Sequence, residues 1–315
     1  MYKRQGGGGV VYQESHSVSA TGYSIVVGPG GLGRSGPMYA GQGSNGTSST
    51  AFGYTAGGGG GGGSYNGSTQ VGAGGAGGAS GGGAGWSPAT QPGGTATGAS
   101  GHPGGVDIVS PTAGWGNNGG NGGSPSVAIY TTGGGGGAVG GGGNGDSANS
   151  GGGGDGAVYT TLNGEPTSFG GGGGGGMQGT NGTAGRGGAG GGGAGGVYNA
   201  TAVTAIGGSN GGEPGSSYGY RNARPSNNQP NPTGNETGLG GPGGVGSGGG
   251  GGGMGVSVQQ GGHGGPGICV VRYATPGYAG GHTAVDRLEA TGGIVCIDYE
   301  NKKACPLYTS PSPRD

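Results

Sequence analysis

Apolar side chains in this chain occur in short runs of β-branched and aromatic residues, and most runs lead into a glycine-rich stretch. Runs of this length and composition, bounded by glycine and proline, are typical of β-strands. We therefore expect a chain of short strands with little or no α-helix. The predicted strands lie at Tyr23–Val27, Val106–Val109, Ser126–Thr132, Ala157–Leu162, Val197–Ile206, Ile268–Tyr273 and Gly293–Tyr299.

Glycine recurs at every third residue between these runs, most clearly from Gly238 to Tyr273. A polyproline II helix has three residues per turn and no internal hydrogen bonds, so its backbone groups must pair sideways with neighbouring helices. Glycine once per turn permits that close approach, and a Cβ there would intrude between segments. The predicted structural glycines are Gly72, Gly75, Gly78, Gly187, Gly190, Gly193, Gly241, Gly244, Gly250 and Gly253.

Composition decides what can hold such a chain together. It contains 107 glycines and 18 prolines in 315 residues, and 27% of its residues are hydrophobic. Ordering each backbone residue costs about 1–2 kcal/mol of entropy, and glycine lies at the upper end, so an apolar interior cannot carry the fold. The chain is either disordered or held by lateral main-chain hydrogen bonds. The period of three favours the second, and the predicted fold class is mostly β or other: a glycine-rich polyproline II bundle or sandwich with short strands.

Charge and cysteine content exclude several classes of function. The net charge is −1 and charged residues make up 7% of the chain, whereas nucleic-acid binding needs a basic surface. No run of 18 apolar residues occurs, so we expect no membrane insertion. The three cysteines, at positions 269, 296 and 305, have no close pair and do not form a disulfide framework pattern.

No arrangement of side chains points to catalysis or metal binding. Matches to GxGxxG follow from the glycine content alone, and no P-loop sequence is present. His16, His102, His263 and His282 lack ligand spacing to one another or to cysteine. The stretch Ser150–Asp155 approaches a calcium-binding nonapeptide but does not recur in tandem. We expect no enzymatic activity, no cofactor and no metal site.

One segment, Ser216–Thr237, differs from the rest because it is rich in tyrosine, asparagine and proline. Its composition predicts an exposed loop, and loops on a rigid scaffold commonly carry binding function. Tyrosine is rigid and amphipathic, which suits a recognition surface. The predicted receptor-binding residues are Tyr218, Tyr220, Arg221, Arg224, Asn227 and Asn228.

Three features of the chain resemble a known family. They are the predicted strand Tyr23–Val27 running into Gly-Pro-Gly-Gly, the poly-glycine blocks, and the closing sequence GGPGICVVRY that ends at Tyr273. Over about residues 6–275 the chain resembles the glycine-rich domain of phage tail-fibre and other virion proteins. The resemblance implies a structural or host-recognition role in a phage tail fibre. It also implies layered polyproline II helices with variable loops at one end, in the virion tail or an extracellular setting. It implies two kinds of partner. One is a host cell-surface glycan or outer-membrane protein, and the other is further tail-fibre subunits, with a homotrimer as one assembly of this chain.

Both ends of the chain, residues 1–5 and 305–315, resemble translated sequencing-adaptor sequence, so we expect them to be scars on a fragment of environmental origin. Between them we expect a glycine-rich domain at 6–275, and then a linker with the truncated start of a second module at 276–304. Two other functions fit the same sequence. They are a bacterial extracellular surface or matrix protein, and an ice-binding protein.

Overall fold

The computed structural model describes residues 6–19, 21–33, 42–63, 73–77, 80–85, 90–112, 114–123, 130–160, 164–178, 182–198, 243–244, 249–250, 261–272, 297–298 and 303–304. These residues contain no helix, and all their strands are short. The strands are β1 (Ile25–Val26), β2 (Ser49–Ala51), β3 (Tyr54–Ala56), β4 (Ala157–Thr160), β5 (Pro166–Phe169), β6 (Met177–Gln178), β7 (Val197–Tyr198), β8 (Ile297–Asp298) and β9 (Lys303–Ala304).

The strands form small separate sheets. Strands β1, β2 and β3 make an antiparallel sheet, in which Ala51 pairs with Tyr54 to close the β2–β3 hairpin. Strands β4 and β5 pair antiparallel over four residues, from Ala157 opposite Phe169 to Thr160 opposite Pro166. The β6–β7 pair is parallel and the β8–β9 pair is antiparallel. The sheets are too small to organise the molecule, and the glycine-rich segments between them do so.

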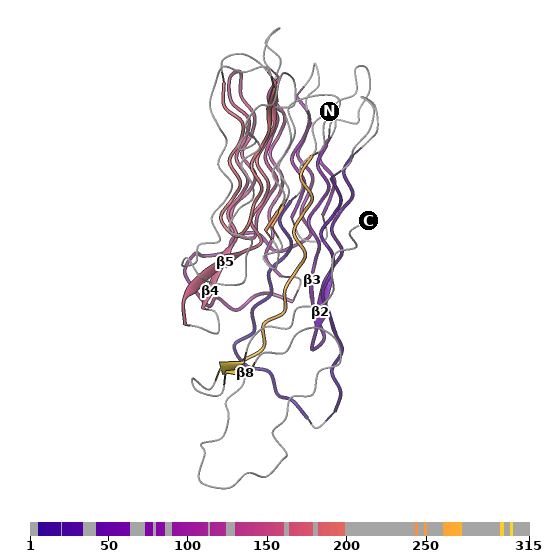
Figure 1. Ribbon diagram of the computed structural model, residues 1–315, viewed down its shortest axis with the longest axis vertical. Helices are drawn as coiled ribbons and strands as arrows, with labels where there is room; N and C mark the ends of the chain where they lie inside the picture. The colour runs from indigo at the N-terminus through magenta and orange to yellow at the C-terminus, as the bar shows by residue number, and fades with distance from the viewer. Residues whose placement is uncertain are drawn as a thin grey trace.

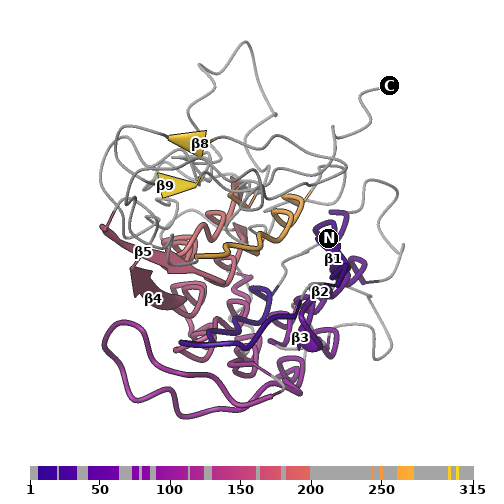
Figure 2. The same ribbon diagram turned by 90° about the horizontal axis from the view of Figure 1, so that it is seen from below.

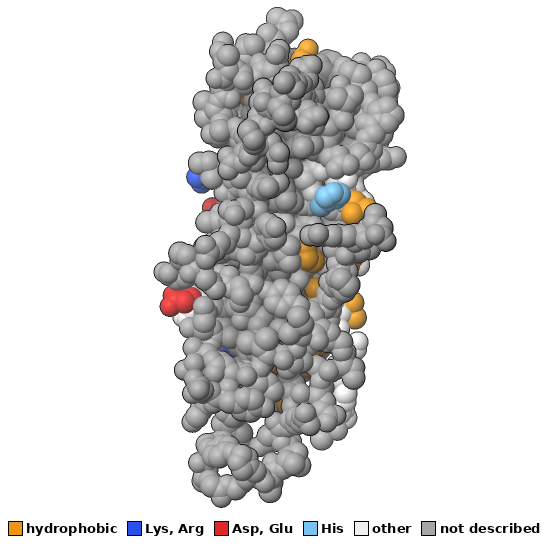
Figure 3. All heavy atoms as spheres, in the orientation of Figure 1, with side chains coloured by type: hydrophobic (Ala, Val, Ile, Leu, Met, Phe, Trp, Pro, Cys, Tyr) orange, Lys and Arg blue, Asp and Glu red, His pale blue; other side chains and the backbone are white. Residues whose placement is uncertain are grey.

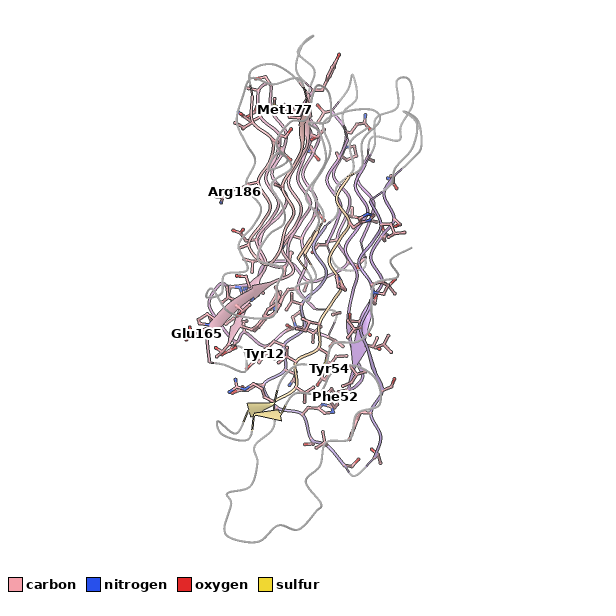
Figure 4. The ribbon with its side chains drawn as sticks, viewed as in Figure 1. Tyr12, Phe52, Tyr54, Glu165, Met177 and Arg186 are labelled. Atoms are coloured by element: carbon pink, nitrogen blue, oxygen red, sulfur yellow. The ribbon has the colours of Figure 1, made fainter. Side chains whose placement is uncertain are left out.

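Glycine-rich segments run side by side along the long axis of the molecule (Figure 1). Seen end-on, they appear as narrow coils gathered into a bundle rather than as the edge of a flat sheet (Figure 2). Strands β2 to β5 lie toward one end of this bundle, which we call the hairpin end. The buried Met177 of β6 lies at the opposite end (Figure 4). We call the set of glycine-rich segments the lattice.

Main-chain hydrogen bonds between segments hold the lattice together. Segment 133–137 exchanges such bonds with six other segments: 6–9, 80–85, 116–123, 140–146, 149–156 and 170–176. Representative distances are 2.8 Å from Gly134 N to Gly143 O and 2.8 Å from Gly135 N to Gly173 O. Almost every one of these partners is distant in sequence and is itself glycine. A buried main-chain group needs a partner, and here it finds one in a neighbouring segment.

These segments approach too closely for most side chains. At Gly133, Gly134, Gly136 and Gly137, an added Cβ would lie within 3.0 Å of a neighbouring carbonyl group, a separation that real Cβ atoms essentially never show. The contacted atoms belong to backbone, so a substitution would have to move a whole segment. Glycine is therefore required here by close contact between segments of the chain, apart from any need for unusual backbone angles.

Side chains pack into two small cores, one at each end of the bundle. At the hairpin end, Tyr159 and Phe169 are buried with Ala138 and Ala157, and Tyr12, Trp115 and Ile268 pack against them. At the opposite end, Met177 is buried with Ala184 and Ala194. The hydroxyl groups of Thr132 and Ser150 there donate to the carbonyl of Gly176. Apolar packing thus closes the ends of the bundle, whereas the backbone fills its middle.

The prediction of a mostly non-helical chain with short strands is confirmed for the described residues. Strands β1 and β4 fall inside predicted runs, and β7 and β8 occupy parts of two others. Two predicted runs differ. Residues 106–109 form no strand beyond an isolated bridge from Val106 to Val158, and residues 268–272 belong to no strand. Among the described residues, the backbone from Ile268 to Arg272 makes no main-chain hydrogen bond, so this β-branched run lacks the lateral partner that a strand needs.

Candidate functional site

Four rings gather at the hairpin end: His16, Tyr23, Phe52 and Tyr54, which we call the aromatic cluster. The centroid of the His16 ring lies 5.3 Å from that of Phe52, 5.7 Å from that of Tyr54 and 6.4 Å from that of Tyr23. Tyr23 and Phe52 are 5.2 Å apart. His16 is exposed and the Tyr23 side chain is 38% exposed, so water reaches this cluster. Phe52 and Tyr54 project from the β2–β3 hairpin (Figure 4).

Phe52 lies in the hairpin turn with a strained backbone conformation. Phe52 has a φ of 52° and Gly53 a φ of 83°, the left-handed pair of a two-residue type I′ turn. Asparagine or aspartate usually precedes glycine in such turns, because a bulky residue with positive φ is strained. Residues held in sparsely populated backbone regions cost about 1–3 kcal/mol and gather at functional sites. The strain makes Phe52 a candidate for a role beyond folding.

Hydrogen bonds fix the orientation of Tyr23 in the cluster. The Ser19 main-chain N–H donates to the Tyr23 hydroxyl oxygen at 2.8 Å, and the Ser19 hydroxyl lies 3.3 Å from the same oxygen. These hydrogen bonds from Ser19 lower the pKa of Tyr23 from its ordinary value, because they favour the phenolate. The ring is thus anchored by its polar atom while its faces remain available.

A groove of about 480 Å³ runs beside the cluster. Its walls come from residues 11–18, from the β1–β2–β3 sheet and from residues 268–272. The lining includes rings from His16, Phe52 and Tyr54, apolar side chains such as Val18 and Val270, and the polar side chains of Gln13, Glu14, Ser15, Thr50 and Arg272. Apolar walls with a few polar groups are the usual lining of a small-ligand site, and the volume falls within the range of about 300–1,000 Å³.

A second cavity of about 330 Å³ lies between the groove and the lattice. It shares Glu14, Val270 and Arg272 with the groove. One wall is formed by Tyr12 and Tyr159, whose rings stack with centroids 4.9 Å apart and an interplanar angle of 15°. Burial raises the pKa of Tyr159 to about 12, so this hydroxyl stays protonated and donates to the carbonyl of Ile108 at 3.4 Å. The wall is therefore rigid and neutral.

The loop at residues 98–112 packs onto β4 through a carboxylate. The Asp107 carboxylate accepts from the Thr160 main-chain N–H at 2.9 Å and from the Thr160 hydroxyl at 2.7 Å. His102 of this loop is 8% exposed, and its Nδ1 accepts from the Gly104 N–H at 3.0 Å. The His102 ring lies edge-on to Trp115, with centroids 5.1 Å apart. Burial lowers the pKa of His102, so the loop carries a neutral imidazole at neutral pH.

The predicted receptor-binding residues Tyr218, Tyr220, Arg221, Arg224, Asn227 and Asn228 lie outside the described residues. Of the predicted structural glycines, Gly72, Gly78, Gly241 and Gly253 also lie outside them. Gly75 N donates to Gly61 O at 2.7 Å, Gly193 N to Gly250 O at 2.7 Å, Gly244 N to Gly191 O at 2.8 Å and Gly250 N to Gly171 O at 2.8 Å. Each of these four glycines takes part in the lattice bonding.

The register in the 187–193 stretch is interrupted. In and beside this stretch, an added Cβ would meet backbone at five glycines: Gly185, Gly188, Gly190, Gly192 and Gly195. A turn at residues 189–191 divides the stretch, and there Gly190 has a φ of 97°, which side-chain-bearing residues rarely adopt. On each side of the turn two of these glycines are three residues apart, Gly185 with Gly188 and Gly192 with Gly195. Of the predicted glycines in this stretch, Gly187 is buried, Gly190 lies in the turn, and Gly193 donates its N–H to Gly250.

Sequence reasoning did not find the aromatic cluster. The stretch before Gly53 is polar except for Phe52, and Phe-Gly is a rare sequence for a type I′ turn, so no hairpin was expected there. His16 lacks ligand spacing to the other histidines, and nothing in its local sequence indicates that other rings lie beside it. One sequence signal could have identified the hairpin. In Thr50-Ala51-Phe52-Gly53-Tyr54-Thr55, two short β-prone segments flank a glycine-containing turn.

The described surface offers little charge or metal-binding chemistry. In the space-filling view, few charged side chains are visible on the described part of this face, and they lie mainly along one edge (Figure 3). The described residues contain no group of three or more His, Cys, Asp or Glu residues that could hold a metal ion. Within the same residues, the structure has no helix of the length and apolar character needed to cross a membrane. Cys269 is a free thiol whose pKa is raised by burial.

Comparisons with protein-family models, with curated proteins and with solved structures gave no match to this chain.

Proposed function

We propose that this chain is a non-enzymatic structural and host-recognition protein of a phage tail fibre. In this proposal the lattice is a stiff platform, and side chains at its ends meet a receptor on the host surface. The observation that supports it best is segment 133–137, whose main chain bonds to six neighbouring segments. A body built in this way leaves few side chains for chemistry along its length and concentrates them at its ends.

We further infer that the lattice segments are polyproline II helices. The support is the spacing of three between Gly182, Gly185 and Gly188, each of which packs against another backbone, together with bonding that runs between segments rather than within them. A polyproline II helix has that repeat and leaves its backbone groups free to pair laterally. Circular dichroism tests this directly: a polyproline II spectrum lost cooperatively on heating supports the inference, and a random-coil spectrum without a transition contradicts it.

The receptor-facing surface comprises the aromatic cluster and the tyrosine-rich loop around Tyr218 and Arg221. The first is supported by the half-buried rings of a strained hairpin and the exposed rings of His16 and Tyr23 beside them. The second rests on composition. A host glycan or an outer-membrane protein remains the proposed receptor, and other tail-fibre subunits the proposed assembly partners, with the virion tail or the extracellular space as the location.

Immunogold electron microscopy with antibodies against the purified chain tests the assignment. Virions and cells collected from the same sample should show label on the tails of virions. Label confined to cell envelopes would overturn the proposal in favour of a bacterial surface protein. Adsorption of the fluorescent chain to bacterial cells gives an independent measure of host recognition, and an absence of adsorption to any strain in a broad panel would contradict that part.

A further inference from the structure

The aromatic cluster combines three properties that a folded end does not need. Its rings are partly in water, its central turn is strained at Phe52, and a groove of about 480 Å³ opens beside it. If the cluster served only to close the bundle, an unstrained Asn-Gly turn and buried rings would serve better. Grouped apolar surface that stays exposed usually marks a place where something binds.

The lining of the groove narrows the chemistry of the ligand. Rings from Phe52 and Tyr54 offer flat faces with negative electrostatic potential, which attract the weakly positive hydrogens of C–H groups. Beside them lie hydroxyl, amide, carboxylate and guanidinium groups from Ser15, Gln13, Glu14 and Arg272, which can pair with hydroxyl groups in either direction. A pyranose ring has both features, a face of C–H groups and a rim of hydroxyls.

The balance of charge argues for a neutral ligand. Glu14 and Arg272 are the two ionised side chains that line this groove among the described residues, and their charges oppose each other. The described lining contains no cluster of cations facing the rings, so an anionic sugar, a phosphate or a nucleic acid would have no matching electrostatic field. A lipid chain would leave the polar wall without partners, which is unfavourable for a desolvated group.

We propose that the aromatic cluster and its groove bind a neutral saccharide, with a sugar ring stacked on Phe52 and Tyr54 and its hydroxyls bonded to the polar wall. Tyr23, held by Ser19, and His16 form the edge of the platform. Rigid rings lose little entropy on binding, and the fixed hairpin holds them in place beforehand. This inference deepens the proposed function and depends on it only for the source of the sugar, which would be the surface of a bacterial host.

The site can be tested with a variant that the turn itself favours. In Phe52→Asn the ring is lost, while asparagine suits the left-handed position, so hairpin strain is relieved. Phe52→Tyr keeps a ring and serves as the matched control. Val109→Asn removes a side chain that is 46% exposed in the 98–112 loop, away from the groove lining, and controls for loss of exposed apolar surface.

The probes are arrays of immobilised neutral bacterial cell-surface polysaccharides and neutral plant and yeast polysaccharides, read with the fluorescent full-length chain. We expect binding to at least one neutral polysaccharide, a loss of at least tenfold in Phe52→Asn, and changes below twofold in Phe52→Tyr and Val109→Asn. Saturation-transfer NMR on the unmodified chain gives a second readout: irradiating aromatic protons should saturate sugar C–H protons of a soluble oligosaccharide derived from the bound polymer.

The outcomes separate this inference from the proposed function. Binding that is unchanged in Phe52→Asn, or no binding to any neutral polysaccharide, overturns the saccharide site. Adsorption to bacterial cells without binding to any neutral polysaccharide would leave host recognition standing and overturn the saccharide site alone. Binding limited to plant and yeast polymers would support the site and contradict the bacterial host. Thermal unfolding of Phe52→Asn at or above the temperature of the unmodified chain verifies that the variant is folded.

Discussion

Segment 133–137 in the middle of the lattice and segment 182–188 at its side follow different rules for where glycine is needed. The central segment bonds to six others and consists entirely of glycine. The side segment bonds to three others, 149–156, 170–176 and 192–196, and carries the side chains of Thr183, Ala184 and Arg186 between its glycines. Arg186 points away from the bundle (Figure 4).

The difference shows that the number of neighbours determines the glycine content. In the side segment, Gly182, Gly185 and Gly188 face backbone at close range, whereas Arg186 is exposed and Ala184 packs into the small core with Met177. In the central segment an added Cβ would meet backbone at Gly133, Gly134, Gly136 and Gly137, so four consecutive or nearly consecutive positions exclude a side chain. A period of three thus indicates a segment at the side of the lattice, and an unbroken glycine block indicates one inside it.

The largest effect is expected from Gly134→Ala. Its Cβ would run into the Gly152 carbonyl, and the central segment cannot shift because it is surrounded. We expect the free energy of unfolding to fall by about 3 kcal/mol or more, at or beyond the upper end of overpacking costs. The matched control is Gly152→Ala, whose Cβ would find its nearest atom 3.7 Å away at Arg186 O. Equal denaturation midpoints for the two variants would contradict the lattice.

A smaller effect on stability is expected in the side segment. This segment has neighbours on one side only, so it can shift outward to relieve a clash. Gly185→Ala should lower the free energy of unfolding by about 2 kcal/mol. Arg186→Ala, one residue along, should change it by less than about 0.5 kcal/mol, since its side chain is exposed. Alanine substitutions along 182–188, followed by denaturant unfolding, should show losses repeating every three residues. A uniform profile would argue against the repeat.

Asparagine side chains extend the bonding at another side of the lattice, with an effect of about 1 kcal/mol. The Asn118 Oδ1 accepts from Ala96 N at 2.8 Å, and three residues on, the Asn121 Oδ1 accepts from Gly93 N at 3.0 Å. Asn121→Ala should destabilise by about 1 kcal/mol through the lost acceptor. Asn121→Asp retains an acceptor and should restore most of the loss in thermal unfolding. Destabilisation by Asp as great as that by Ala would assign the effect to packing.

The smallest effect is expected in the pH dependence of stability, through His102. Burial lowers the pKa of His102 below its ordinary value of 6.5, so acid protonates the unfolded chain first. Stability should be full above pH 6.5 and should decline as pH falls through the lowered pKa, because the charged imidazole must give up accepting from Gly104 N–H. Unfolding curves at several pH values should show this slope, and His102→Gln should lack it. A slope that persists in His102→Gln would assign it to other groups.

Part of the structure was predictable from particular residues. The runs around Ile25 and Val158 predicted β1 and β4, because β-branched and aromatic residues favour strands wherever they find a partner. Strand β5 begins at Pro166 in a stretch without that composition, and it forms because Phe169 is buried against Tyr159. The run Ile268–Arg272 has the composition of a strand without a main-chain partner among the described residues. Propensity specifies which segments can pair, and only packing decides which do.

By itself the sequence determined the source of cohesion. With glycine at a third of its positions and few apolar side chains, the chain can be ordered only if backbone bonds to backbone. The spacing of three fits the polyproline II helices that we propose for the lattice. Only the tertiary structure decided which segments are central, because glycine blocks carry no side chains that could distinguish one neighbour from another. It also brought His16 and Tyr23 beside the strained turn at Phe52, since a site assembled from separate segments depends on where the lattice ends and not on any local pattern.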